Sequence, residues 1–166
     1  MLIIDGYNFL NAMFGLEHSM PIRDMQAARI EMQDRLVRYR NISGAKIRVV
    51  YDARGVRLPN EDYSGVEIVC APASSNADDH IVRTVQGSPR PAGITVVTSD
   101  RDLGDRVKQA GGRVILCKAF YRQMLAAFEQ GAAPVDDKAH EKPTRPDPDE
   151  VDYFLRRFGD DTRGKK

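Results

Sequence analysis

Three short apolar runs each lead into an aspartate, and this pattern restricts the fold more than any other feature of the sequence. The first run, Leu-Ile-Ile at positions 2–4, shows no polar alternation before Asp5. Such a run is typical of a parallel strand that is buried on both faces, as in an open α/β sheet covered by helices. The runs and their aspartates are residues 2–4 with Asp5, residues 46–51 with Asp52, and residues 94–98 with Asp100.

Two further strands and five helices complete the expected alternation. Asp24 and Asn76 are good candidates for helix N-caps, and Gly15 and Gly131 for helix ends. The order predicts a mostly parallel five-stranded α/β sheet with helices on both faces, which is a Rossmann-like three-layer sandwich. The remaining strands are expected at 66–70 and 113–117, and the helices at 9–14, 24–39, 77–86, 101–110 and 119–130.

The composition changes after residue 131. Residues 1–131 form the predicted domain, and residues 132–150, with four prolines among charged residues, are expected to be a flexible linker. Residues 151–158 predict a short amphipathic helix, and 159–166 a disordered tail. So short a helix needs a surface to be stable, and docking on its own domain is favoured over a partner because the linker keeps it close.

Composition limits the classes of function. With 42% hydrophobic residues the chain can bury an ordinary core, and a net charge of +1 provides no overall attraction for nucleic acid. No signal-peptide pattern and no membrane-spanning run is visible. Cys70 and Cys117 lie near the ends of apolar runs, as buried reduced thiols do. We therefore expect a cytoplasmic protein without membrane contact, and the oligomeric state stays open.

The aspartates are expected to meet although they are far apart in sequence. The carboxyl ends of parallel strands lie at one edge of the sheet, and helices that follow those strands begin there. Clustered carboxylates repel one another unless a cation is present, and oxygen ligands suit Mg²⁺ or Mn²⁺. Such ions support phosphodiester hydrolysis. The predicted cluster is Asp5, Asp52, Asp78 and Asp100, with Asp79 and Asp102 beside it.

Each aspartate also has a purely structural interpretation. Asp5 can cap the next helix, and Ser99 with Asp102 fits a capping box. Asp78 and Asp79 would interact favourably with the dipole of the helix that they open. The coincidence of four such acids at the predicted sheet edge favours a shared site over four separate caps.

Three motifs, in this order, resemble the YacP-like NYN domains of the PIN-like nuclease superfamily. They are IIDGYN at residues 3–8, Ala77-Asp78 at a helix start, and VTSDRD at residues 97–102. The resemblance covers about residues 1–130. It implies a PIN-like fold with strand order 3-2-1-4-5, which would place the two cysteines on opposite edge strands. It also implies a metal-dependent endoribonuclease that uses one or two Mg²⁺ or Mn²⁺ ions, with messenger RNA and the ribosome as possible partners.

The motif match carries functional roles onto particular residues. Asp5, Asn8, Asp78 and Asp100 correspond to the catalytic residues, and the three aspartates among them to metal ligands. Asp102 matches a further metal ligand of many PIN-like domains, although YacP-like members vary there. Asp52 and Asp79 remain possible additional acids, either as ligands or as structural residues.

Basic residues near the same edge are candidates for RNA contacts, with Tyr7 or Tyr121 available for stacking on a base. For any one arginine, ordinary solubility is the better explanation. His18 and His80 are given no catalytic role, because His80 does not share a helix face with Asp78. The predicted RNA-binding residues are Arg54, Arg57, Arg101, Lys118 and Arg122.

Three other functions are compatible with clustered acids. A phosphotransferase with an aspartyl nucleophile would need an acid two residues after Asp5, where Tyr7 stands. A phosphate-accepting receiver domain would need an early acid pair and a lysine after its last strand, which Lys118 matches only loosely. A non-catalytic RNA- or ribosome-binding module of the same fold is the main alternative to a nuclease.

Overall fold

The computed structural model describes residues 1–15, 22–52, 60–72 and 76–131. Residues Met1–Ala133 form one compact unit. The predictions for Arg54, Arg57 and His18 lie outside the described residues. The same holds for the predicted linker, C-terminal helix and tail at 132–166. None of the helices in the described segments is long and apolar enough to cross a membrane.

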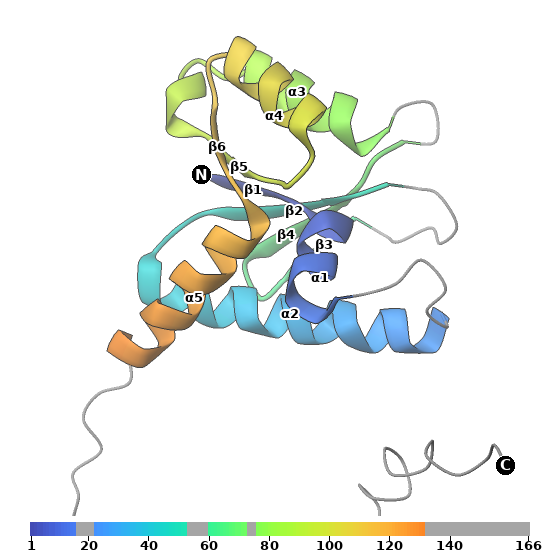
Figure 1. The fold of residues 1–166 in the computed structure, drawn as a ribbon, viewed down its shortest axis with the longest axis vertical. Helices are drawn as coiled ribbons and strands as arrows, with labels where there is room; N and C mark the ends of the chain where they lie inside the picture. The colour runs from blue at the N-terminus through green and yellow to red at the C-terminus, as the bar shows by residue number, and fades with distance from the viewer. Residues whose placement is uncertain (16–21, 53–59, 73–75, 132–166) are drawn as a thin grey trace, which may run out of the picture. The chain divides into compact units, whose positions relative to one another are not determined.

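A six-stranded sheet forms the centre of the described domain (Figure 1). The strand order is β3-β4-β2-β1-β5-β6, and every neighbouring pair is parallel except β3 with β4. The strands are β1 (Leu2–Asp5), β2 (Ile47–Tyr51), β3 (Glu61–Tyr63), β4 (Val66–Cys70), β5 (Thr95–Val97) and β6 (Arg113–Ile115).

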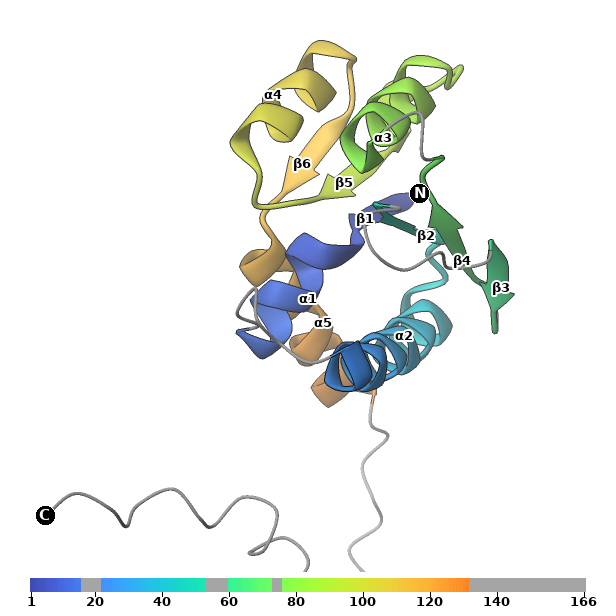
Figure 2. The ribbon, with the colours of Figure 1, turned by 90° about the vertical axis from the view of Figure 1, so that its right-hand side faces the viewer.

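Helices cover both faces of the sheet, as predicted for an α/β sandwich. Figure 1 shows α3 and α4 on one face and α1, α2 and α5 on the other, and the rotated view in Figure 2 agrees. The helices are α1 (Gly6–Phe14), α2 (Ile22–Ser43), α3 (Ala77–Gln86), α4 (Arg101–Gln109) and α5 (Cys117–Gly131), with a 3-10 turn, η1 (Pro91–Gly93), before β5.

The apolar run of β1 is explained by its central position between β2 and β5. Ile3 packs into the core under α3 and α4, whereas Ile4 packs into the core under α1, α2 and α5. Both side chains are completely buried, so successive residues need to be apolar on both faces. The burial of β1 therefore fixes the position of Asp5, which is the last residue of this strand.

The fold corrects several details of the predicted elements. The sheet has six strands instead of five, because the polar segment Glu61–Tyr63 adds an antiparallel edge strand beside β4. The other five strands have the order implied by the family resemblance. The helix predicted at residues 24–39 is too short at its C-terminal end, since α2 continues to Ser43. That helix also begins at Ile22, so Asp24 is not its N-cap.

The helix ends and the cysteines also differ from expectation. Helix α1 begins at Gly6, directly after the strand, and ends before Gly15 in the left-handed conformation. Gly131 is the last residue of α5 and does not follow it. Cys70 ends β4, which β3 flanks, and Cys117 begins α5. Neither cysteine is therefore on an edge strand, and both are free thiols.

Gly6 allows a close approach between α1 and the end of β2. A Cβ atom at Gly6 would lie 2.4 Å from Cε1 and 2.5 Å from Cδ1 of Tyr51, whose ring is fully buried. The glycine is thus required by the neighbouring aromatic ring. This contact fixes the first turn of α1, and with it the position of Asn8.

We expect Gly6→Ala to destabilise the fold by about 1–3 kcal/mol, because the added methyl group overlaps the Tyr51 ring. Gly104→Ala is the matched control, since Gly104 is also a buried helical glycine but its Cβ would lie 3.6 Å from Val114. The control should be neutral or gain about 0.5–1 kcal/mol. Urea unfolding measures both, and equal effects of the two substitutions would contradict the packing explanation.

Candidate functional site

Asp5 lies where β1 ends and α1 begins, and its carboxylate is 6% exposed. Its Oδ2 accepts a hydrogen bond from Nδ2 of Asn8 at 2.6 Å and another from Oγ1 of Thr98 at 3.0 Å. Its Oδ1 accepts from the backbone N–H of Asn8 at 3.4 Å, which makes Asp5 the N-cap of α1. The capping interpretation is therefore correct, and the same carboxylate is also linked to β5 through Thr98.

Burial raises the pKa of Asp5 above its usual range, although the hydrogen bonds from Asn8 and Thr98 oppose the shift. The charge of Asp78 raises this pKa further. The charge of Asp78 therefore acts on Asp5 at the carboxyl edge of the sheet. In the described segments no lysine or arginine forms an ion pair with Asp5, so its burial is offset there by hydrogen bonds and not by a positive charge.

Thr98 connects Asp5 to the turn that carries Asp100. Its buried Oγ1 donates to Asp5 and accepts from the backbone N–H of Asp100 at 3.1 Å. Asp100 is the N-cap of α4, accepting from the N–H of Leu103 at 3.0 Å. The predicted capping box of Ser99 and Asp102 is therefore wrong by one position, because Asp100 occupies the N-cap.

Asp78 is half-buried in the first turn of α3, which Asn76 caps as predicted. Burial raises the pKa of Asp78, and the charge of Asp100 raises it further. Arg106 opposes this shift, while Asp79 and Asp102 add to it. The charges of Asp79, Asp100 and Asp102 therefore act on Asp78, and the charge of Asp78 acts on Asp5. Asp5, Asp78, Asp100 and Asp102 are called the acidic group below.

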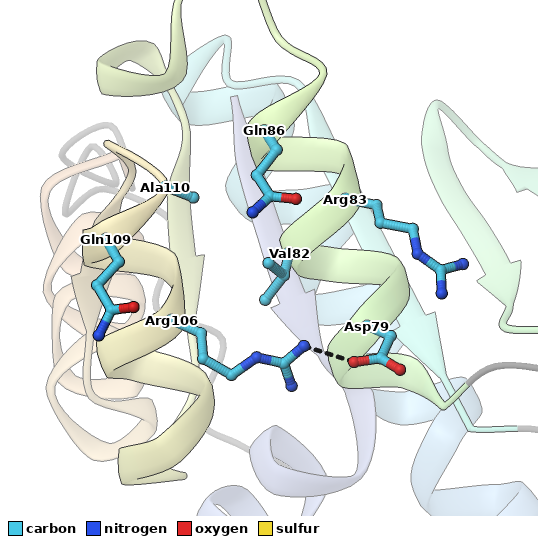
Figure 3. A pocket seen from close by; sticks show the side chains of 7 residues that line it. All are labelled: Asp79, Val82, Arg83, Gln86, Arg106, Gln109 and Ala110. Carbon is cyan, nitrogen blue, oxygen red and sulfur yellow. Dashed lines mark hydrogen bonds and ion pairs between the residues drawn. The ribbon is translucent and has the colours of Figure 1, made fainter.

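Asp79 faces a different partner from Asp78. Figure 3 shows its carboxylate joined to the guanidinium of Arg106 across the space between α3 and α4. These two side chains line a groove that continues past Val82 towards Gln86. Asp79 therefore neutralises Arg106 and belongs to the contact between the helices.

The other predicted site residues differ in their contacts and in their exposure. Asn8 holds Asp5, and Asp102 is exposed in the first turn of α4. Asp52 follows β2 at the same edge of the sheet but is not among the charges that shift the pKa of Asp5 or of Asp78. Arg101, Lys118 and Arg122 are all exposed.

Tyr7 and Tyr121, the two candidates for stacking on a base, each contact another ring of the protein. The hydroxyl of Tyr121 accepts a hydrogen bond from Arg35 at 2.9 Å, and its ring packs edge-on against Phe9. Tyr7 packs edge-on against Tyr51. Both residues are half-buried, and their role in stacking stays a prediction.

His80 lies outside the acidic group. Burial lowers the pKa of His80, as do the charges of Arg48 and Arg83. The carboxylate that affects it is Glu67, and no member of the acidic group does so.

The acids do not form a closed cage of ligands. Among the residues that the structure describes, no group of three or more His, Cys, Asp or Glu side chains is arranged to hold a metal ion. The aspartates instead repel one another, and Asp78 is partly buried, so both effects raise its pKa.

Comparisons with known proteins agree with this fold and these motifs. The model of the YacP-like NYN domain matches residues 2–152. The chain belongs to the YacP-like NYN domain family. This family is one of PIN-like nuclease domains, so the main element of the predicted function, a nuclease-type domain, is supported at that level.

Two solved structures have a similar fold, and both are crystal structures of Rae1 (YacP) from Bacillus subtilis. One, of a mutant, is 22% identical with a TM-score of 0.66, covering 78% of this chain and 77% of that one. The other is 21% identical with a TM-score of 0.65, covering 78% and 76%. Identities this low show the fold alone. A search of the curated proteins finds no match.

Sequence analysis missed two residues that shape the acidic group of this YacP-like domain. Thr98 ends an apolar run two residues before Asp100. A hydroxyl at that position can form a hydrogen bond between the strand end and the turn that follows it. Arg106 gave no signal, because its partner Asp79 lies 27 residues away on another helix.

The raised pKa of Asp5 predicts a gain in stability when its charge is removed. Asparagine keeps the N-cap, so Asp5→Asn removes chiefly the penalty for a buried carboxylate. Because the pKa is raised in the folded state, this penalty is present at neutral pH and is lost as the pH falls and Asp5 becomes protonated. We expect the metal-free variant to gain about 1 kcal/mol at neutral pH.

Urea unfolding at about pH 7 and about pH 4 tests this expectation. Asp105→Asn, on the exposed side of α4, is the control and should change little at either pH. A variant that is less stable than wild type at neutral pH would show that the hydrogen bonds of the Asp5 carboxylate outweigh its desolvation.

Proposed function

We propose that this YacP-like domain is a metal-dependent endoribonuclease that hydrolyses phosphodiester bonds of RNA. The observation that carries the proposal is the electrostatic coupling of Asp78 with Asp5, Asp100 and Asp102, contributed by β1, α3 and α4. Membership of a nuclease family supports the reaction class. In the described segments no basic side chain forms an ion pair with Asp5, Asp78 or Asp100, although the charge of Arg106 lowers the pKa of Asp78. Clustered carboxylates of this kind would favour a bound cation.

The donor set fits a hydrated hard cation better than a fully protein-bound one. Mg²⁺ keeps several waters and commonly uses one or two carboxylates, and Mn²⁺ accepts the same oxygen ligands. Asp5, Asp78 and Asp100 would hold one or two such ions, directly or through water, with Asp102 as a further candidate. When bound, the ion supplies an activated water and neutralises charge on the phosphate.

The protein side chains contribute by positioning. Asn8 and Thr98 hold both the orientation and the ionised form of Asp5, since each donates to its carboxylate. Arg106 binds Asp79 and also lowers the pKa of Asp78, so its charge acts on both acids of α3. Messenger RNA, in connection with the ribosome, is the substrate that the family resemblance implies; it stays part of the proposal. Arg101, Lys118 and Arg122 are its candidate contacts among the described residues.

We expect Asp78→Asn and Asp100→Asn each to lower cleavage of unstructured RNA in Mn²⁺ by about 100-fold or more, the loss typical of an impaired metal site. Asp105→Asn is the matched control, because Asp105 is an exposed aspartate of α4 paired with Lys108. A chelator should abolish wild-type cleavage, and added Mn²⁺ should restore it. Gel analysis of a labelled RNA measures the rates.

Two outcomes would contradict the proposal. Cleavage that persists in the chelator would exclude a metal-dependent reaction. Wild-type protein that binds RNA but never cuts it would instead support the non-catalytic RNA-binding module.

A further inference from the structure

A polar pocket borders the acidic group on the side of α1 and α5. It has a volume of about 390 Å³. Asn8 belongs to both places, because its amide donates to Asp5 while its side chain also lines the pocket. Ser99, another lining residue, directly precedes Asp100 in sequence. The lining residues are Asn8, Asn11, Ala12, Gly15, Ser99 and Lys118.

The chemistry of the pocket is opposite to that of the acids beside it. Its polar groups are the amides of Asn8 and Asn11, the hydroxyl of Ser99 and the ammonium of Lys118, and none of the lining residues is acidic. Ala12 and Gly15 contribute little side-chain volume, and a Cβ at Gly15 would meet nothing within 4 Å. The pocket therefore offers open space with one positive charge and several hydrogen-bonding groups.

The walls of the pocket belong to well-packed elements. Helices α1 and α5 lie side by side in both ribbon views, joined by the rings of Phe9 and Phe120 at 5.3 Å (Figures 1 and 2). Cys117, next to Lys118, is fully buried and shares a hydrogen bond with Ser99. Lys118 thus projects from a fixed point on the first turn of α5.

We propose that this pocket binds the RNA nucleotide adjacent to the cleaved bond, with Lys118 on its phosphate and Asn11 and Ser99 on its sugar or base. The inference rests on the proposed function and extends it with a binding subsite. Lysine binds phosphate as a point charge, and amide and hydroxyl groups hydrogen-bond to the edges of unstacked bases in single-stranded RNA. A cationic subsite is also needed next to acids that repel the RNA backbone.

The groove between α3 and α4 is less suited to this role. The guanidinium of Arg106 there is already paired with Asp79, and Figure 3 shows Arg83 directed away from Arg106. Lys118, in contrast, forms no ion pair with any residue in the described part of the chain. Its charge is therefore available to a phosphate.

The test uses the full chain with Asp100→Asn as background, so that RNA is bound but not cut. Adding Lys118→Ala should weaken binding of a labelled single-stranded RNA about tenfold. The slope of log affinity against log salt should also fall by about 0.7, the value for one phosphate contact. Asn11→Asp, which places a carboxylate in the pocket, should weaken binding at least as much. Lys108→Ala removes the same charge from the exposed side of α4 and should leave the slope unchanged.

Steady-state cleavage in the otherwise wild-type protein completes the test. Lys118→Ala and Asn11→Asp should raise KM more than they lower kcat, because the subsite binds RNA and does not touch the reacting atoms. If wild-type protein cleaves RNA but neither substitution changes affinity, salt slope or KM, the subsite is refuted and the nuclease stands. If RNA binding depends on Lys118 and Asn11 but no cleavage occurs, the subsite stands and the nuclease fails.

Discussion

The burial of β1 between β2 and β5 is the constraint on which the rest of the structure depends. Ile3 and Ile4 are completely buried on opposite faces, so the strand cannot shift without exposing apolar surface. Its last residue, Asp5, is consequently held in a desolvated position. Hydrogen bonds from Asn8 and Thr98 do not fully offset that desolvation, since the pKa of Asp5 is still raised. A carboxylate kept at such a cost is typical of a functional site.

Parallel pairing then brings together acids that are distant in sequence. Asp100 follows β5 and Asp78 begins the helix after β4, so both lie near the end of β1. Neighbouring acids nevertheless have different partners. Asp78 is coupled to Asp5, Asp79 and Asp100, whereas Asp79 also forms an ion pair with Arg106 in the space between two helices. The sheet topology places these acids at the carboxyl edge of the strands. Their side-chain partners determine which of them form ion pairs there.

Much of this arrangement could be predicted from residues whose burial or capping role is local. The apolar runs identified five strands, and Asn76 marked the start of α3. The edge strand Glu61–Tyr63 was missed because it is polar and its pairing depends on β4, which lies after it in the sequence. Both Ser99 and Asp100 are good N-cap residues, so the sequence could not decide between them; in the structure Asp100 accepts the capping hydrogen bond from Leu103, and Thr98 accepts one from the N–H of Asp100. The pair of Arg106 and Asp79 joins two helices and has no sequence spacing that could reveal it.

The charges at the sheet edge also explain why cation and RNA binding should depend on each other. The chain has a net charge of only +1, so RNA gains little from the overall field of the protein. Near the edge, the unpaired carboxylates would repel a phosphate, and Lys118 alone cannot neutralise several of them. A bound divalent cation would reverse the sign of the local field and favour the phosphate beside it. By linkage, RNA in the pocket would strengthen cation binding to the same degree, so each ligand raises the affinity for the other.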